Sequence, residues 1–167
     1  MTSVTSQTRP VTPTPSLHPE VEVLAFLLGT WRGEGRGGYP TIDDFDYRDE
    51  LAFAHVGKPF VSYTQRTWLA DDAPSHTEVG YLRAQPGGRV ELVVAQPGGR
   101  VEVDEGTLRG THFELTSTVM AHTRSAKEVA EVRRVVDVDG DTLRYEVEMA
   151  AVGHPRQFHL EAELRRA

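Results

Sequence analysis

Turn signals recur along most of this chain of 167 residues and separate short segments in which apolar and polar residues alternate. The signals are Gly57-Lys58-Pro59, Asp71-Asp72-Ala73-Pro74, Pro86-Gly87-Gly88, Pro97-Gly98-Gly99, Gly110 and Asp139-Gly140-Asp141. Strands joined by turns this close form an antiparallel meander, and a long meander loses its exposed edges by closing on itself. We therefore predict an all-β fold, an antiparallel up-and-down β-barrel of about ten strands.

The N-terminal part of the chain lacks this alternating pattern. Residues 1–17 are rich in Ser, Thr and Pro and have no apolar periodicity, which predicts a disordered tail. The folded domain is predicted to span residues 18–167. It opens with residues 19–28, which begin with Pro19, carry apolar side chains at helical spacing and stop before Gly29. This segment predicts a short helix that covers one end of the barrel.

The composition excludes several kinds of chemistry and of partner. The chain contains no cysteine, which excludes thiolate metal ligation and thiol catalysis. Its 25 acidic and 18 basic residues give a net charge of −7, and no basic stripe is interleaved with aromatic residues, so no nucleic-acid partner is expected. The sequence shows neither the apolar run of a signal peptide nor a segment long enough to span a bilayer. These features predict a cytoplasmic protein without a membrane partner.

One segment departs from ordinary strand composition, because glycine takes alternate positions in Gly29-Thr30-Trp31-Arg32-Gly33-Glu34-Gly35. Each glycine weakens a strand and leaves a gap where a side chain would stand. The generic explanation is a barrel corner, or a place where a large residue such as Trp31 folds across a neighbouring strand. The other explanation is a flat ligand pressed against the wall. Glycine alternation alone favours the corner, whereas the block Tyr39-Pro40-Thr41-Ile42 that follows shifts the balance towards the ligand.

These two blocks together resemble the signature that opens the barrel of the nitrobindins, a family of haem-binding proteins. The resemblance covers most of residues 20–166 and implies one ferric haem b per chain inside a lipocalin-like barrel. Further similar blocks are Phe45 to Tyr47 with Glu50, His55-Val56-Gly57-Lys58-Pro59, Glu78 to Arg83, Val101 to Gly106 and Ser125-Ala126-Lys127-Glu128.

Histidine is the residue type that could hold the iron of such a haem. The chain has seven: His18, His55, His76, His112, His122, His154 and His159. None forms a His-x-His or His-x-x-x-His pair, so a multi-histidine metal site has no local support, whereas a single axial ligand needs no such spacing. In the nitrobindins a histidine ahead of a leucine in the last strand is the axial ligand, and Phe158-His159-Leu160 resembles that block. His55 is assigned a structural role, as a cap or a buried hydrogen-bonding group.

Strict alternation raises a difficulty for His159. Phe158, Leu160 and Leu164 would share the inner face of the last strand, and a regular strand would then point His159 away from the interior. Either a bulge between Pro155 and Leu160 or a haem seated at the mouth of the barrel would remove the difficulty. The sequence leaves both alternatives open.

The resemblance implies further contacts with the haem. Thr41, in the Tyr-Pro-Thr block, and Lys127, in the Ala-Lys block, map to positions that contact the haem, and a hydroxyl and an ammonium suit its propionates. His76, Gln96 and Met149 map to pocket-lining positions, where His76 could hydrogen-bond a ligand of the iron. Without the resemblance, Lys127 would be a solvated loop charge, Thr41 a turn residue, His76 a loop histidine and Met149 a core residue.

The function that the resemblance implies is isomerisation of peroxynitrite to nitrate, together with nitric oxide binding, by a cytoplasmic ferric haem protein with His159 as the catalytic iron ligand. Two rival functions use the same barrel. A lipocalin-like carrier would hold a fatty acid or another apolar molecule. A non-catalytic nitric oxide sensor or transporter would use the same haem. The oligomeric state stays open, with a homodimer as one alternative.

Overall fold

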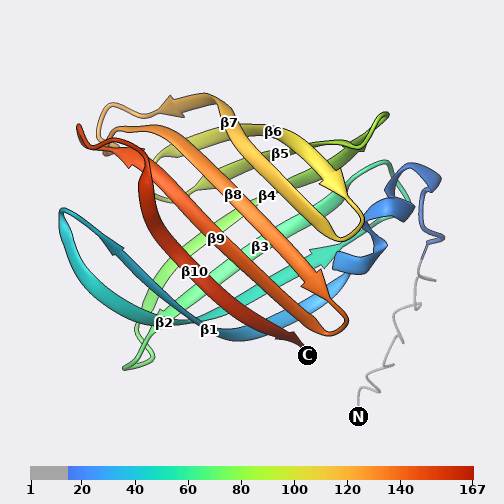
Figure 1. Cartoon of the computed structure of the whole chain (residues 1–167), viewed down its shortest axis with the longest axis horizontal. Helices are drawn as coiled ribbons and strands as arrows, with labels where there is room; N and C mark the ends of the chain where they lie inside the picture. The colour runs from blue at the N-terminus through green and yellow to red at the C-terminus, as the bar shows by residue number, and fades with distance from the viewer. Residues whose placement is uncertain (1–14) are drawn as a thin grey trace, which may run out of the picture.

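Ten strands form a closed antiparallel barrel in the computed structural model, which describes residues 15–167 (Figure 1). Within residues 15–167 each strand pairs with the next along the chain, and the first pairs with the last, so the sheet closes on itself without an edge strand. The strands are β1 (Gly29–Tyr39), β2 (Ile42–Ala54), β3 (Val61–Leu69), β4 (Pro74–Gln85), β5 (Arg89–Gln96), β6 (Arg100–Arg109), β7 (His112–His122), β8 (Val129–Asp139), β9 (Thr142–Ala151) and β10 (Gln157–Arg166). The predicted up-and-down barrel is confirmed, and every predicted turn signal falls at or beside a junction of two strands.

The predicted N-terminal tail lies mostly outside the described residues. Of the part that is described, Leu17 packs against the core of the barrel. A Cβ at Gly57 would lie 2.9 Å from the Cβ of Pro15, so contacts with the barrel reach the first described residue.

A short helix covers one end of the barrel, at the right of Figure 1. This helix, η1 (Pro19–Leu27), is a 3-10 helix with three residues per turn, so Val21, Leu24 and Leu27 lie in one row, and all three are fully buried. Gly29 follows with a φ of +117°, a conformation that side chains disfavour, and turns the chain into β1. The predicted helix and its glycine stop are confirmed. No helix within residues 15–167 is long and apolar enough to cross a membrane.

Trp31 joins this helix to the barrel. Its indole is fully buried, and Nε1 donates a hydrogen bond to the carbonyl oxygen of Leu27 (2.7 Å). The guanidinium of Arg166 lies 4.0 Å from the centre of the indole ring and donates to the carbonyl oxygens of Phe26 and Leu28. Trp31 therefore holds both the helix and the last strand at the closed end.

The glycines of β1 are required by neighbouring strands. A Cβ at Gly33 would lie 2.1 Å from the carbonyl oxygen of Glu163 on β10, and a Cβ at Gly35 would lie 2.4 Å from the ring of Tyr47 on β2. The flat-ligand explanation is therefore wrong for these positions. The prediction that a large side chain fills the space beside these glycines is correct at Gly35. That side chain is Tyr47, not Trp31.

The interior changes character from the closed end to the open end. Along β2 the buried side chains run from Phe53 and Leu51, near the helix, to Asp49 and then Tyr47. The closed end is apolar, and a layer of buried polar side chains lies above it. This polar layer comprises Asp49, Gln65, Thr67, Glu78, Glu102 and Asp104, with Arg134 among them. A chamber of about 40 Å³ separates Arg134 from the apolar side chains.

Candidate functional site

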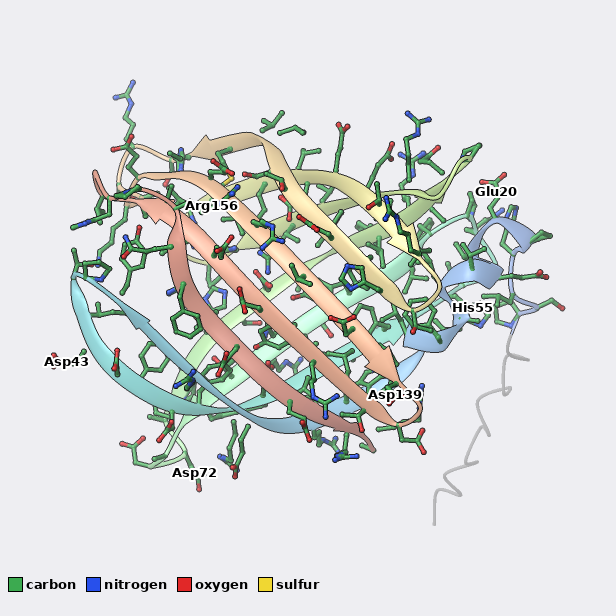
Figure 2. The ribbon with its side chains drawn as sticks, viewed as in Figure 1. Glu20, Asp43, His55, Asp72, Asp139 and Arg156 are labelled. Atoms are coloured by element: carbon green, nitrogen blue, oxygen red, sulfur yellow. The ribbon has the colours of Figure 1, made fainter. Side chains whose placement is uncertain are left out.

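The sequence-predicted haem contacts lie at the end of the barrel opposite the helix. His159 is near the start of β10, Thr41 is in the turn between β1 and β2, and Lys127 is in the loop between β7 and β8. Figure 2 labels Asp43 and Arg156 at this open end, away from Glu20 and His55 at the helix. The fold thus brings three residues from distant parts of the sequence to one rim.

A β-bulge presents His159 to the interior. Phe158 pairs with Glu148 of β9, whereas Leu160 pairs with the adjacent Val147, so His159 is the extra residue in the ladder. The bulge breaks the alternation: Leu160 packs against the core, while Phe158 is 38% exposed. The bulge alternative is the one that the structure shows, and the expectation that Phe158 shares the inner face is wrong.

Backbone geometry fixes the imidazole of His159. Nδ1 lies 3.2 Å from the carbonyl oxygen of Gly38, to which it donates in the neutral tautomer with hydrogen on Nδ1. Burial lowers the pKa of His159, the bond to Gly38 opposes that shift, and the positive charge of Arg100 lowers the pKa further. The neutral ring therefore keeps its Nε2 lone pair for a metal, with the second nitrogen held by a backbone acceptor.

Tyr39 supports the wall beside this imidazole. Its ring lies edge-on to His159, with 5.7 Å between ring centres and 81° between the planes. The hydroxyl accepts from the N–H of Ala151 (2.8 Å) and lies 3.2 Å from the carbonyl oxygen of Met149, to which it donates. Tyr39 thus ties β1 to β9 across the first residues of β10, where the bulge occurs.

The predicted pocket residues lie on two sides of the interior. In the closed strand order β5 is opposite β10, so Gln96 at the end of β5 faces His159, and His76 on the adjacent β4 lies beside it. His76 is 37% exposed, and its Nε2 lies 3.8 Å from Glu78. Met149 is on β9, next to His159, and packs against the core.

The polar layer beneath these residues was not predicted. Arg134 pairs with Glu78 (3.1 Å), with Glu102 and with Asp104 (3.2 Å). Gln96 donates to Glu78 (3.0 Å) and Glu102 (2.9 Å), so the layer reaches the wall of the pocket. The sequence of β6 contains a signal for this layer, because its acidic residues alternate with valines. Ordinary alternation would have placed the valines inside the barrel and the acidic residues outside.

The carboxyl groups of this layer titrate over a wide range. Burial raises the pKa of Glu78, but Arg134 and the interactions with His76 and Tyr63 outweigh it and hold the pKa at about 2. Burial raises the pKa of Asp104 to about 7 despite Arg134. Burial also raises the pKa of Asp49 to about 6, against hydrogen bonds from neighbouring side chains and backbone.

Two other histidines have local structural partners. Nδ1 of His55 accepts from the N–H of Gly57 (3.3 Å), and Nε2 of His122 accepts from the N–H of Val129 (3.2 Å). His55 takes the structural role predicted for it. Both side chains stabilise loop backbone, so neither nitrogen is available as a ligand.

A large hollow of the described surface lies away from these residues. It is an open groove of about 1140 Å³ on the outside of the barrel, along β8, β9, β10, β1 and β2. Its rim alternates arginines with acidic residues, among them Arg36 paired with Glu161 and Arg144 paired with Glu163. These charges neutralise one another, and the groove contains none of the predicted haem contacts.

The closed barrel and the imidazole that points into its open end together indicate a class of protein. It is a small β-barrel protein that binds a ligand at its mouth. The chain belongs to the family described as THAP4-like, heme-binding beta-barrel domain, whose model matches residues 20–166. The predicted membership of the nitrobindin family is confirmed by this match and by the relatives below.

The relatives match over nearly their whole length. The chain is 48% identical to peroxynitrite isomerase 2 of Mycobacterium marinum, covering 90% of this chain and 96% of that protein. It is also 48% identical to the peroxynitrite isomerase of Nocardia farcinica, covering 92% and 95%. The crystal structure of Rv2717c from M. tuberculosis matches with a TM-score of 0.85 at 46% identity, over 91% of this chain and 99% of that one.

The residues at the open end fit a haem. Within residues 15–167 no three His, Asp or Glu side chains come together to hold a metal ion, so an iron there would bring further ligands with it, as the porphyrin nitrogens of haem do. His159 would offer a neutral imidazole nitrogen to its iron. Phe45, Met149 and Leu160 offer partly buried apolar surface for a flat macrocycle.

Proposed function

We propose that this protein binds one ferric haem b through Nε2 of His159 and isomerises peroxynitrite to nitrate in the cytoplasm, and that the same site binds nitric oxide. The observation that carries the proposal is the β-bulge, which turns His159 inward as a neutral imidazole with Nδ1 held by Gly38. The heme-binding description of the family and the names of the relatives support it.

The iron of the haem would supply the electrophilic centre at which the peroxynitrite anion rearranges. The chain holds the proton on Nδ1 of His159, so that Nε2 stays a ligand. Tyr39 keeps the bulge in place, and the apolar side chains of Met149 and Leu160 exclude water from the face of the macrocycle. The exposed Thr41 and Lys127 lie on the rim, where they would meet the haem propionates.

The interior favours this function over an apolar carrier. A fatty acid needs a continuous apolar cavity, but the layer around Arg134 divides the barrel, and the chamber below it measures about 40 Å³. Such a chamber has room for little more than one or two waters. A flat ligand at the open end is therefore the better match.

Haem binding is tested by titrating the apo protein with hemin. We expect a Soret band that saturates at one haem per chain, and its loss in His159→Ala. His154→Ala is the matched control, because His154 also lies edge-on to Tyr39, at 5.9 Å, and should leave binding intact. Equal loss in both variants would show that the ligand is assigned wrongly.

Catalysis is tested on the same proteins by stopped-flow. Ferric holo-protein should speed peroxynitrite decay over many turnovers, yield nitrate and protect free tyrosine from nitration. Because the chain has no thiol, apo protein and His159→Ala should show at most stoichiometric loss through oxidation of their own side chains. A holo-protein no faster than the apo protein would reject isomerisation and leave nitric oxide sensing or transport.

A further inference from the structure

We propose that Arg100 binds the anionic ligand of the haem iron, from the wall of the barrel that faces His159. The inference rests on the proposed function and deepens it, because it names the residue that selects an anion over a neutral ligand. None of the sequence motifs of the family points to Arg100, and its position becomes evident only in the closed barrel.

The strand order puts Arg100 opposite His159. Counted round the barrel, β5 is opposite β10, and β6 is next to β5. Arg100 is the first residue of β6, at the open end, and pairs with Gln96 of β5. Its side chain points inward like that of Glu102, which is 1% exposed, since the intervening Val101 is 44% exposed on the outer face.

A series of hydrogen bonds orients the guanidinium of Arg100. One of its terminal nitrogens donates to Oε1 of Gln96. The amide nitrogen of Gln96 donates to both Glu78 and Glu102, which fixes the amide with its oxygen towards Arg100. Arg134 in turn pairs with both carboxylates. The donors of Arg100 are therefore in place before a ligand arrives, which lowers the entropic cost of binding.

The charge of Arg100 has no counter-ion within residues 15–167. No acidic side chain there forms an ion pair with it, and its Nε–H is buried without a hydrogen-bond acceptor. Burial lowers the pKa of Arg100, Glu102 and Glu78 oppose that shift, and the charge of Arg134 adds to it, yet a guanidinium stays protonated in proteins. Both carboxylates are already paired with Arg134. A partly desolvated cation with unused donors favours an anion over a neutral ligand.

The geometry of a guanidinium suits the proposed ligand. Its planar fork presents parallel N–H donors, which match two acceptor atoms of a small anion such as peroxynitrite. The chain as a whole carries a net charge of −7, which repels anions from a distance. A fixed positive charge across the pocket from His159 offsets that repulsion where the anion must bind. His76 lies on the other flank of Gln96, with its Nε2 3.8 Å from Glu78.

The test uses ferric holo-protein with azide as the anionic probe and imidazole as the neutral one. Arg100→Gln should weaken azide binding by about ten- to a hundredfold, the usual effect of losing a hydrogen bond to a charged group, and leave the imidazole affinity unchanged. Arg100→Lys keeps the charge but not the planar guanidinium. Its azide affinity should lie between that of Arg100→Gln and that of the native protein. Arg66→Gln, an exposed arginine on the outer face of β3, is the matched control and should match the native protein for both probes.

Three results would overturn the proposal. Unchanged azide affinity in Arg100→Gln would do so directly, and an equal loss of azide and imidazole affinity would show a general effect on the pocket. Weaker binding of hemin, but not of its dimethyl ester, would show that Arg100 holds a propionate. Failure of the native protein to bind hemin through His159 rejects the proposed function as well, whereas a normal Soret band with unchanged azide affinity rejects only the role of Arg100.

Discussion

The closed and open ends of the barrel are built in different ways. At the closed end, Trp31 is fully buried, bonded to the helix and covered by Arg166. At the open end, Thr41 and Lys127 are exposed, and His159 depends on a single bulge. The glycine and tryptophan motif that makes the chain recognisable thus serves stability at the end away from the predicted chemistry. Residues that identify a family and residues that act in it need not be neighbours.

The polar layer separates these two ends and shares features of both. The carboxyl groups of Glu78 and Glu102 are as buried as the apolar core, yet both are paired with Arg134. A buried ion pair adds little net stability over an apolar pair of the same size. What the charges supply here is orientation, since they hold Gln96, and Gln96 holds Arg100.

The largest effect on stability is expected at the closed end. Trp31→Ala should lower the free energy of unfolding of the apo protein by about 3–5 kcal/mol, because it opens a cavity and removes the bond to Leu27. Urea denaturation measures the loss. The fraction that remains folded should bind hemin with native affinity. A large loss of hemin affinity in folded Trp31→Ala would show that the two ends are coupled.

A change in the polar layer is expected to have an intermediate, pH-dependent effect on the free energy of unfolding. The folded pKa of Asp49, about 6, is above the ordinary value of 3.8, so the native state keeps a proton that the unfolded chain has released. The contribution of Asp49 to the free energy of unfolding is largest below pH 4. About 3 kcal/mol of it is lost as the pH rises through 6. Asp49→Asn should therefore gain about that much relative to the native protein between pH 4 and pH 7.

Urea denaturation of the apo proteins at pH 4, 5.5 and 7 measures this difference. Asp43→Asn, at an exposed position on the β1–β2 hairpin, is the control and should follow the native pH profile (Figure 2). The titrations of Glu78, whose pKa shift has the opposite sign, and of Asp104 occur in all three proteins. A constant difference at all three pH values would mean that Asp49 is not held in a desolvated state.

The smallest effect is expected for a charge change on the rim of the open end, and it concerns hemin affinity. Lys127→Glu should leave unfolding unchanged but weaken hemin affinity by about 1 kcal/mol, roughly fivefold, because an ion pair with a propionate at an exposed position is screened by water. Lys58→Glu makes the same charge change in the loop before β3, at the closed end, and should not alter hemin affinity. An equal decrease in both variants would indicate a general charge effect, and no decrease in Lys127→Glu would make that lysine a solvated loop residue.

Much of the fold could be predicted because its signals are local. Positive φ at Gly87, Gly99, Gly110 and Gly140 is a property of single residues that glycine accepts readily, so the turns could be read from the chain. Strands between such turns have few ways to pair other than as a meander. His159 was singled out by a short block of similar residues, which required no knowledge of how the strand is built.

Other features depend on residues that meet only in the closed barrel. Alternation predicted that Phe158 faces inward, but the pairing of β10 with β9 inserts a bulge that turns His159 inward instead. The explanation of Gly35 by a ligand failed because the ring that fills its space comes from Tyr47 on another strand.

The sequence by itself determined the barrel, its turns and its helix, because each of these follows from a local pattern. Only the tertiary structure decided which polar side chains are buried together and that Arg100 on β6 faces His159 on β10. The physical reason is that a strand's own sequence fixes which residues share a face. Which face is inside, and what lies across from it, is fixed by the register and closure of all ten strands.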